Sequence, residues 1–309
     1  MTGLVVIVVL HLVVDVVAGS VMALLPSLQD RKGLSDAAMT VLVATFVISS
    51  SIAQPLAGRI ADRHDARSVA ALGAVAAAVL LSPLVLAPTA AVLYLLVAAG
   101  GLAMAAFHPS ASVVARHSGP ARADLAIGLG GGGGAVGAAL GPAIALGSLP
   151  HGGVTAALVL GLPAAAAGLL ALRLLPTSPP TERRARGRRL TWTPTLVQLT
   201  IAGTLTATAG VSFAAGYPGW MIDHGLRPDN PAIGWTLALF SGTGAVSGVA
   251  ATWLWRERRP SRLMAGSVGL AALPLLATLT LAPGSPASLV AIAAAGLLLG
   301  AGIPATVAL

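Results

Sequence analysis

The sequence predicts an all-α protein that crosses a lipid bilayer many times, and three observations lead to that prediction. Apolar residues make up 56% of the 309 residues and charged residues only 9%, whereas a soluble domain has about 25% charged residues. The apolar residues gather in long runs that short polar segments separate. The basic residues lie mainly in alternate segments between those runs. This composition excludes a water-soluble fold, which would lack a charged surface, and it equally excludes a disordered chain.

Ten apolar runs are long enough to cross the membrane, since about 20 apolar helical residues span its hydrocarbon core. They cover residues 4–27, 37–57, 68–87, 90–114, 125–147, 153–175, 195–217, 232–254, 263–282 and 287–309. The runs lack the alternation of barrel strands and are too long for them. Because only a helix satisfies its own backbone groups in lipid, each run predicts a transmembrane helix. The first run is too long for a signal-peptide core and is expected to be a retained span.

The positions of the 18 basic residues predict the orientation of the chain. If the N-terminus is cytoplasmic, 15 of them lie in cytoplasmic segments and 3 outside, as the positive-inside rule requires. The 15 are Arg59, Arg63, Arg67, Arg116, Arg122, Arg173, Arg183, Arg184, Arg186, Arg188, Arg189, Arg256, Arg258, Arg259 and Arg262. We therefore expect a multi-pass protein of the cell membrane, inner or plasma, with a cytoplasmic N-terminus. The net charge of +8 is explained better by basic residues that set the membrane topology beside anionic lipid than by nucleic-acid binding.

The longest polar segment predicts a division of the chain into two parts. Residues 176–193 contain prolines and an arginine cluster, which is typical of a flexible cytoplasmic linker. The prediction is a six-helix half over 1–175, a basic linker over 176–193, and four helices over 194–309. Because the chain ends at Leu309 within an apolar run, we expect it to be truncated and the second half to be incomplete.

Several classes of function are disfavoured by missing motifs. The chain has no cysteine, so thiolate metal sites and cysteine nucleophiles are excluded. It also lacks the G-x-S-x-G elbow, the H-E-x-x-H zinc motif and the phosphate-binding loop of nucleotide-driven transporters. We therefore expect no enzyme activity, no cofactor and no metal site. The partners expected are the bilayer and a small-molecule substrate, and the expected state is a monomer.

Ionisable residues inside the runs are the candidate functional residues, because charge inside a membrane is costly unless it has a role. His11 and Asp15 are spaced i,i+4 in the first run, so they share a helix face. His108 lies in the fourth run, and Gln54 adds a polar group to the second. A histidine and a carboxylate can pass a proton, which favours a proton or substrate pathway. The alternative is a structural hydrogen bond between helices. A metal site of two histidines and one aspartate is less favoured.

The loop between the second and third runs resembles the signature of the major facilitator superfamily. The pattern G-x-x-x-D-R-x-G-R-R/K is matched by Gly58, Asp62, Arg63 and Arg67, whereas Asp65 stands where glycine is usual. Such a charge cluster can lock one face of a transporter shut. We expect a gating loop, and the alternative is a charged loop that only sets topology. The resemblance implies a bundle of twelve helices, of which ten are present.

The fifth run contains a second pattern. Gly128, Gly137, Gly141 and Pro142 have the spacing G-x8-G-x3-G-P, which resembles the fifth-helix motif of proton-coupled exporters in this superfamily. Glycines on one face allow close helix packing, and proline bends the helix. The alternative is an ordinary small-residue packing face.

Three groups of residues resemble the fosmidomycin-resistance branch of the superfamily. They are His11-Leu12-x-x-Asp15, then Ser50-Ser51-x-x-Gln54-Pro55-x-x-Gly58, then Phe107-His108-Pro109-x-x-Ser112-x-x-Ala115-Arg116. The resemblance implies a secondary transporter that exports a drug or small metabolite, driven by exchange for protons. Alternatives are a proton-coupled importer or facilitator of a small metabolite and, less favoured, an intramembrane enzyme or a transport-inactive truncated chain.

Overall fold

The computed structural model describes residues 2–61, 63–119, 123–178, 193–254 and 260–301, and all regular structure within these ranges is helical. Each of the ten predicted runs coincides with a helical span; the ends differ by a few residues for the first nine, and the tenth run is described only to residue 301. Six described spans in the first half are long and apolar enough on their own to cross a membrane. The predicted all-α membrane fold is therefore confirmed.

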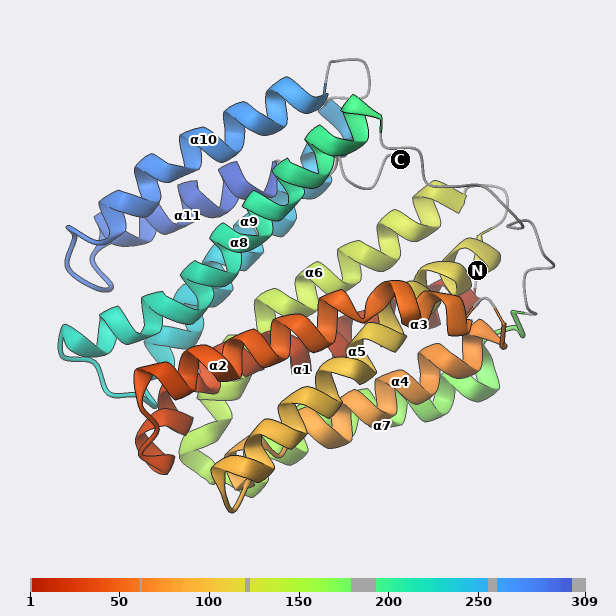
Figure 1. Cartoon of the computed structure of the whole chain (residues 1–309), viewed down its shortest axis with the longest axis horizontal. Coiled ribbons are helices and arrows are strands. Elements are labelled where there is room, and N and C mark those ends of the chain that lie inside the picture. The colour runs from red at the N-terminus through yellow and green to blue at the C-terminus, as the bar shows by residue number, and fades with distance from the viewer. Residues whose placement is uncertain (1, 62, 120–122, 179–192, 255–259, 302–309) are drawn as a thin grey trace. The chain divides into compact units, whose positions relative to one another are not determined.

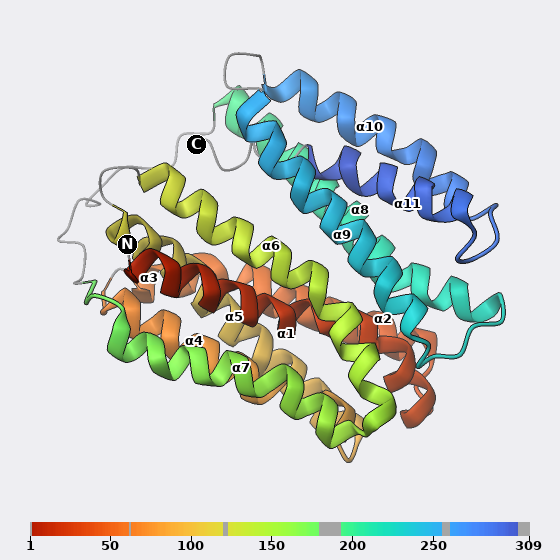
Figure 2. The same ribbon diagram turned by 180° about the vertical axis from the view of Figure 1, so that it is seen from behind.

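The first compact unit of the chain comprises Met1–Arg184. Its continuous helices are α1 (Thr2–Lys32), α4 (Ala66–Leu81), α5 (Ala90–Ser118), α6 (Ala123–Ser148) and α7 (Gly153–Leu174). Helix α1 lies along α6 and also contacts α4, α5 and α7 (Figures 1 and 2). Because α1 touches so many neighbours, side chains on several of its faces are buried within this unit.

The second span is not one continuous α-helix, although the sequence shows one apolar run. It consists of α2 (Asp36–Val47), a π-helical segment (Ile48–Ile52) and α3 (Gln54–Ala61). The π-helical segment packs on α5, where Ser49 occupies the space that a side chain on Gly101 would need. Hydropathy does not reveal this change, because one wide turn leaves the run equally apolar.

Glycines bring α1 and α6 into backbone contact. A Cβ on Gly133 would lie 2.7 Å from the carbonyl oxygen of Val8, and one on Gly19 would lie 2.5 Å from that of Ala138. A side chain at either position would therefore push the two helices apart. This close approach fixes α6 beside the face of α1 that carries Asp15.

The second compact unit comprises Ala185–Leu309. Its helices are α8 (Pro194–Asp223), α9 (Pro231–Leu254), α10 (Pro260–Thr278) and α11 (Pro286–Gly300). Each begins with proline, which suits the first helical position because its missing N–H has no partner there. Helix α11 packs on α9 and α10, and α8 contacts α9 and α10. Most of the predicted linker and the last eight residues lie outside the described residues, so the predicted domain boundaries stay a prediction.

Candidate functional site

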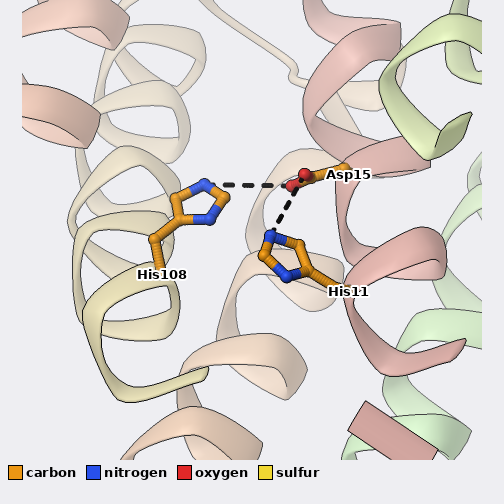
Figure 3. Close-up of side chains that lie close together, drawn as sticks. All are labelled: His11, Asp15 and His108. Carbon is orange, nitrogen blue, oxygen red and sulfur yellow. Dashed lines mark ion pairs between the residues drawn. The ribbon is translucent and has the colours of Figure 1, made fainter. Parts of the chain in front are cut away.

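Two histidines and one aspartate from two helices meet inside the first unit (Figure 3). His11 Nε2 lies 3.5 Å from Asp15 Oδ2 on α1, and His108 Nε2, from α5, lies 3.8 Å from Asp15 Oδ1. The exposed fractions of the three side chains are 12% for His11, 13% for Asp15 and 30% for His108. We call these residues the His–Asp–His cluster. The structure thus joins three of the four residues that the sequence assigns to the pathway.

The local sequence explains how the cluster forms. The i,i+4 spacing puts His11 one turn before Asp15 on the same face of α1. Phe107 is fully buried and packs edge-on against His11, with ring centroids 5.1 Å apart. The same ring packs edge-on against His108 at 5.4 Å. Phe107 therefore holds both imidazoles beside the carboxylate.

Helix α6 closes the cluster on another side through Gly134. A Cβ at this position would overlap Asp15 Oδ2 and would lie 2.6 Å from His11 Cδ2 and 2.8 Å from His11 Nε2. Only glycine leaves this space free while α6 remains packed on α1. The cluster thus lies between three helices, with Gly134 as a backbone wall.

The hydrogen-bonding capacity of the Asp15 carboxylate is not fully satisfied by the described residues around it. Asp15 Oδ1 is buried and has no hydrogen-bond partner among the described residues. Both carboxylate–imidazole distances exceed the usual range of about 2.7–3.2 Å for an N–H···O hydrogen bond. The carboxylate and the two ring nitrogens can therefore accept a proton, a polar group of a substrate or a cation.

Gln54 and Gly58 lie apart from this cluster. Gln54 starts α3, and its Nε2 donates to the Ser50 carbonyl oxygen at 3.0 Å. No hydrogen bond or ion pair within the described ranges joins Gln54 to His11, Asp15 or His108. A Cβ on Gly58 would meet Pro109 of α5 at 3.8 Å, an ordinary contact distance. Packing against α5 thus does not require glycine at position 58.

The predicted gating loop is described only in part. Asp62, the central acidic residue of the pattern, lies outside the described residues, and Arg63 is exposed. Arg67 Nε donates to Asp65 Oδ2 at 3.1 Å, and Arg67 Nη1 donates to the Leu172 carbonyl oxygen of α7 at 3.1 Å. Arg67 therefore links the loop to the end of the sixth span.

Asp65, which departs from the family pattern, is the most connected residue of this loop. Its Oδ1 accepts the Ser178 amide at 2.7 Å, and its Oδ2 accepts the Ser68 hydroxyl at 2.8 Å. Partial burial alone would raise the pKa of Asp65, but the hydrogen bonds from Ser178, Ser68 and Arg67 outweigh it and hold that pKa below its usual value. Asp65 thus attaches the chain that follows α7 to the start of α4.

The glycine pattern of the fifth span divides between two faces of α6. A Cβ on Gly137 would overlap the Leu12 carbonyl oxygen, and one on Gly141 would overlap that of Val16. A Cβ on Gly128 would meet no described atom within 4 Å. Nine residues separate Gly128 from Gly137, so at about 100° per residue they point to opposite sides. Pro142 lies inside the helix one residue after Gly141.

Sequence reasoning assigned no role to Gly134, and it noted Asp65 only as a departure from the loop pattern. Gly134 lies in a run of five glycines, 130–134, and no spacing rule distinguishes one member. The signal available for Asp65 was its position before the helix that starts at Ala66, because acidic residues favour helix N-termini.

Comparisons with known proteins place this fold. A family model described as the Major Facilitator Superfamily matches residues 7–309. The chain is similar to the crystal structure of a bacterial homologue of the human lysosomal transporter Spinster in an inward-facing, occupied conformation. The TM-score is 0.74 and the identity 16%, over 98% of this chain and 72% of that one.

A second similar structure is the nucleoside transporter NupG, with a TM-score of 0.68 and 14% identity, over 99% of this chain and 80% of that one. No curated protein sequence matches the chain. Since the family model matches nearly the whole length, the chain belongs to the major facilitator superfamily, a family of secondary transporters.

Proposed function

We propose that this secondary transporter exports a drug or small metabolite across the cell membrane in exchange for protons. Members of the family work by alternating access, and that coarse function follows from membership. The direction, the coupling ion and the branch are the proposal. The resemblance to the fosmidomycin-resistance branch, which rests on the residues around His11, Gln54 and His108, favours export.

The observation that carries the proposal is the His–Asp–His cluster itself. The other acidic side chains of the described spans lie at or beyond helix ends, whereas Asp15 lies near the middle of α1. A carboxylate inside a membrane bundle is costly and is functional by default. Asp15 is therefore the proposed proton carrier, and His11 and His108 are its proposed partners.

The scarcity of charged side chains within the spans also restricts the charge of the substrate. The sequence places no Arg or Lys deep in a span, and such a residue would be the expected clamp for a dianion. We expect a neutral, cationic or amphipathic substrate, or an anion that binds only when a histidine is protonated. Gln54 is proposed to line the same pathway.

The other residues that the sequence patterns pointed to have proposed structural roles in the transport cycle. The loop with Gly58, Asp62, Arg63 and Arg67 is proposed to stabilise one closed face of the transporter. The α6 residues Gly128, Gly137, Gly141 and Pro142 are proposed to allow that helix to pack closely and bend. We also propose a monomer with a cytoplasmic N-terminus and a cytoplasmic linker over 176–193.

A vesicle experiment tests the proposal. The purified chain is reconstituted, a proton gradient is imposed, and movement of a panel of small drugs is followed with and without that gradient. Asp15→Asn should abolish gradient-driven transport but keep substrate binding, because the amide preserves size and cannot carry the proton. Asp30→Asn, which changes an exposed carboxylate at the end of the same helix, is the matched control.

Full gradient-driven transport by Asp15→Asn would disprove the carrier role. Transport in the direction of the proton flow would identify an importer instead.

A further inference from the structure

We propose that the His–Asp–His cluster is a binding site for a divalent transition-metal cation of the zinc and cobalt class. The proposal uses the residues assigned to the transport cycle, but it stands on their geometry and requires neither export nor proton exchange. It also differs from the expectation of no metal site, because chain spacing alone did not show that α5 brings His108 to the pair on α1.

The distances among the three ligand atoms suit a small cation. One nitrogen from each histidine and one carboxylate oxygen all lie within 4.8 Å of one another. The two shortest nitrogen–oxygen distances are 3.5 Å from His11 to Asp15 Oδ2 and 3.8 Å from His108 to Asp15 Oδ1. Tetrahedral ligands with bonds of about 2.0–2.1 Å lie about 3.3–3.4 Å apart. Each histidine thus lies within a few tenths of an ångström of that spacing from one carboxylate oxygen, and side-chain rotation would need to bring the three ligand atoms, now within 4.8 Å of one another, closer together.

A purely structural hydrogen-bond network would look different. Buried carboxylates and imidazoles that stabilise each other lie about 2.7–3.2 Å apart. Here both distances are longer, and Asp15 Oδ1 is buried without a hydrogen-bond partner in the described part of the chain. Because such an orphaned acceptor is costly, it points to a ligand that the protein alone does not supply.

The ligand types indicate which cation binds. Imidazole with one carboxylate suits zinc, cobalt and nickel, whereas copper(I) prefers thiolate and thioether ligands. Magnesium and calcium require mainly oxygen ligands in larger number. The single carboxylate offsets half the charge of a divalent ion.

Three protein ligands leave at least one coordination position open, as in exchangeable sites rather than closed structural ones. Gly134 sets the size of this space. Its hydrogen faces Asp15 Oδ2 and the His11 ring, and a methyl group there would occupy the volume beside both ligands. Gly134→Ala retains the three ligand residues and their charge, but its methyl group would overlap Asp15 Oδ2 and disturb the arrangement of the ligand atoms.

The test measures cation binding directly, on the tag-free purified chain in detergent and without any gradient. Binding of Co²⁺ is followed by its visible absorption, which reports tetrahedral coordination, and binding of Zn²⁺ by calorimetry. We expect one ion per chain. Asp15→Asn and His108→Gln should each weaken Co²⁺ affinity by at least about tenfold, because loss of even an outer-shell group costs that much. Gly134→Ala should weaken it as well.

The matched control is His64→Gln, which removes an exposed loop histidine and should leave the affinity unchanged. Thermal unfolding of each variant checks that it is folded. The proposal is overturned if the unmodified chain gives no tetrahedral Co²⁺ spectrum, or if folded Asp15→Asn and His108→Gln bind Co²⁺ as well as His64→Gln does.

The experiments distinguish failure of the proposed cation site from failure of the proposed export. A chain that binds no cation but shows Asp15-dependent export loses only this inference. A chain that binds Co²⁺ through the cluster but shows no gradient-driven transport loses only the proposed function.

Discussion

Two helix surfaces, the α1–α6 contact of the first unit and the aromatic face of α8 in the second, are built by different means. In the first, glycines such as Gly137 bring α1 against α6 at backbone contact, beside a cluster of ionisable side chains. In the second unit, glycines also bring α11 against α9, where a Cβ on Gly300 would overlap the Gly244 carbonyl oxygen, whereas aromatic rings follow one face of α8. Phe213 and Tyr217 stack with centroids 4.7 Å apart, and Tyr217 and Trp220 stack at 5.1 Å. Phe240 of α9 joins them, 4.3 Å from Phe213.

The difference shows where each unit tolerates change. In lipid, helices associate through van der Waals packing and hydrogen bonds, since the tails are as apolar as the side chains. Backbone-to-backbone contact leaves no room for an added atom, whereas stacked rings can slide. We therefore expect single-atom changes to disturb the glycine contacts more than the aromatic face of α8.

The largest effect is expected from adding one methyl group to a glycine in each unit. In Gly137→Ala the new carbon would overlap the Leu12 carbonyl oxygen, and overpacking of this kind costs about 1–3 kcal/mol of stability. In Gly216→Ala of α8 the new carbon would meet no described atom within 4 Å, and helix propensity favours alanine by about 1 kcal/mol. Thermal unfolding in detergent should show a lower midpoint for the first variant only. Equal midpoints would remove the contrast between the glycine contact of α6 and the open glycine position of α8.

A middle-sized effect is expected from the carboxylates outside the spans, and it depends on pH. The pKa of Asp65 in the folded chain lies below its usual value, chiefly because hydrogen bonds from Ser178, Ser68 and Arg67 outweigh partial burial. Its contribution to stability is therefore complete above the unfolded pKa of about 3.9 and is lost as the pH falls through the lower folded pKa. Asp65→Asn should reduce stability at neutral pH and lessen its fall in acid.

The control for Asp65 comes from the second unit. Asp229 pairs with Arg227 at 3.1 Å, but the Arg227 side chain is 82% exposed, and exposed pairs contribute about 0–1 kcal/mol. Unfolding of Asp229→Asn between acid and neutral pH should match that of the unmodified chain. If Asp65→Asn and Asp229→Asn show the same change of stability with pH, the contacts of Asp65 do not stabilise the fold more than an exposed ion pair does.

The smallest effect is expected from removing a tyrosine hydroxyl. Tyr217 Oη lies 3.2 Å from Ser288 Oγ in the second unit, and Tyr94 Oη donates to the Ala38 carbonyl oxygen at 2.5 Å in the first. Hydrogen bonds between membrane helices average about 0.6 kcal/mol. Tyr217→Phe should cost about that much in the same unfolding assay and Tyr94→Phe somewhat more, because its bond is shorter. A loss of stability from Tyr217→Phe that exceeds the loss from Tyr94→Phe would contradict this order.

The sequence predicted the fold well because membrane helices can be recognised by the length and apolarity of their sequence segments. All ten runs became helical spans, and the i,i+4 pair of His11 and Asp15 lies on one helix face as expected. Helix periodicity sufficed for that pair, since both residues belong to α1.

The rest depended on contacts between helices, which periodicity does not encode. Periodicity does not say how α5 is rotated about its axis relative to α1, so the contact of His108 with Asp15 became visible only in the structure. The contact of Gly134 with the cluster and the hydrogen bond from Ser178 to Asp65 also depend on contacts between distant parts of the chain, so the sequence pattern did not predict them. The pattern around Gly128 even suggested one packing face, whereas helix geometry places that residue opposite Gly137.

The π-helical segment of the second span has a consequence for reading positions along it. A π turn accommodates one residue more than an α turn, so it shifts the helical phase by about 100°. Gln54 and Gly58 follow the segment, and they therefore face a direction that an uninterrupted α-helix starting at Asp36 would assign to their neighbours. A substitution scan across Ile48–Ile52 should accordingly show two 3.6-residue rhythms that are out of step, as if one position of the span had been counted twice.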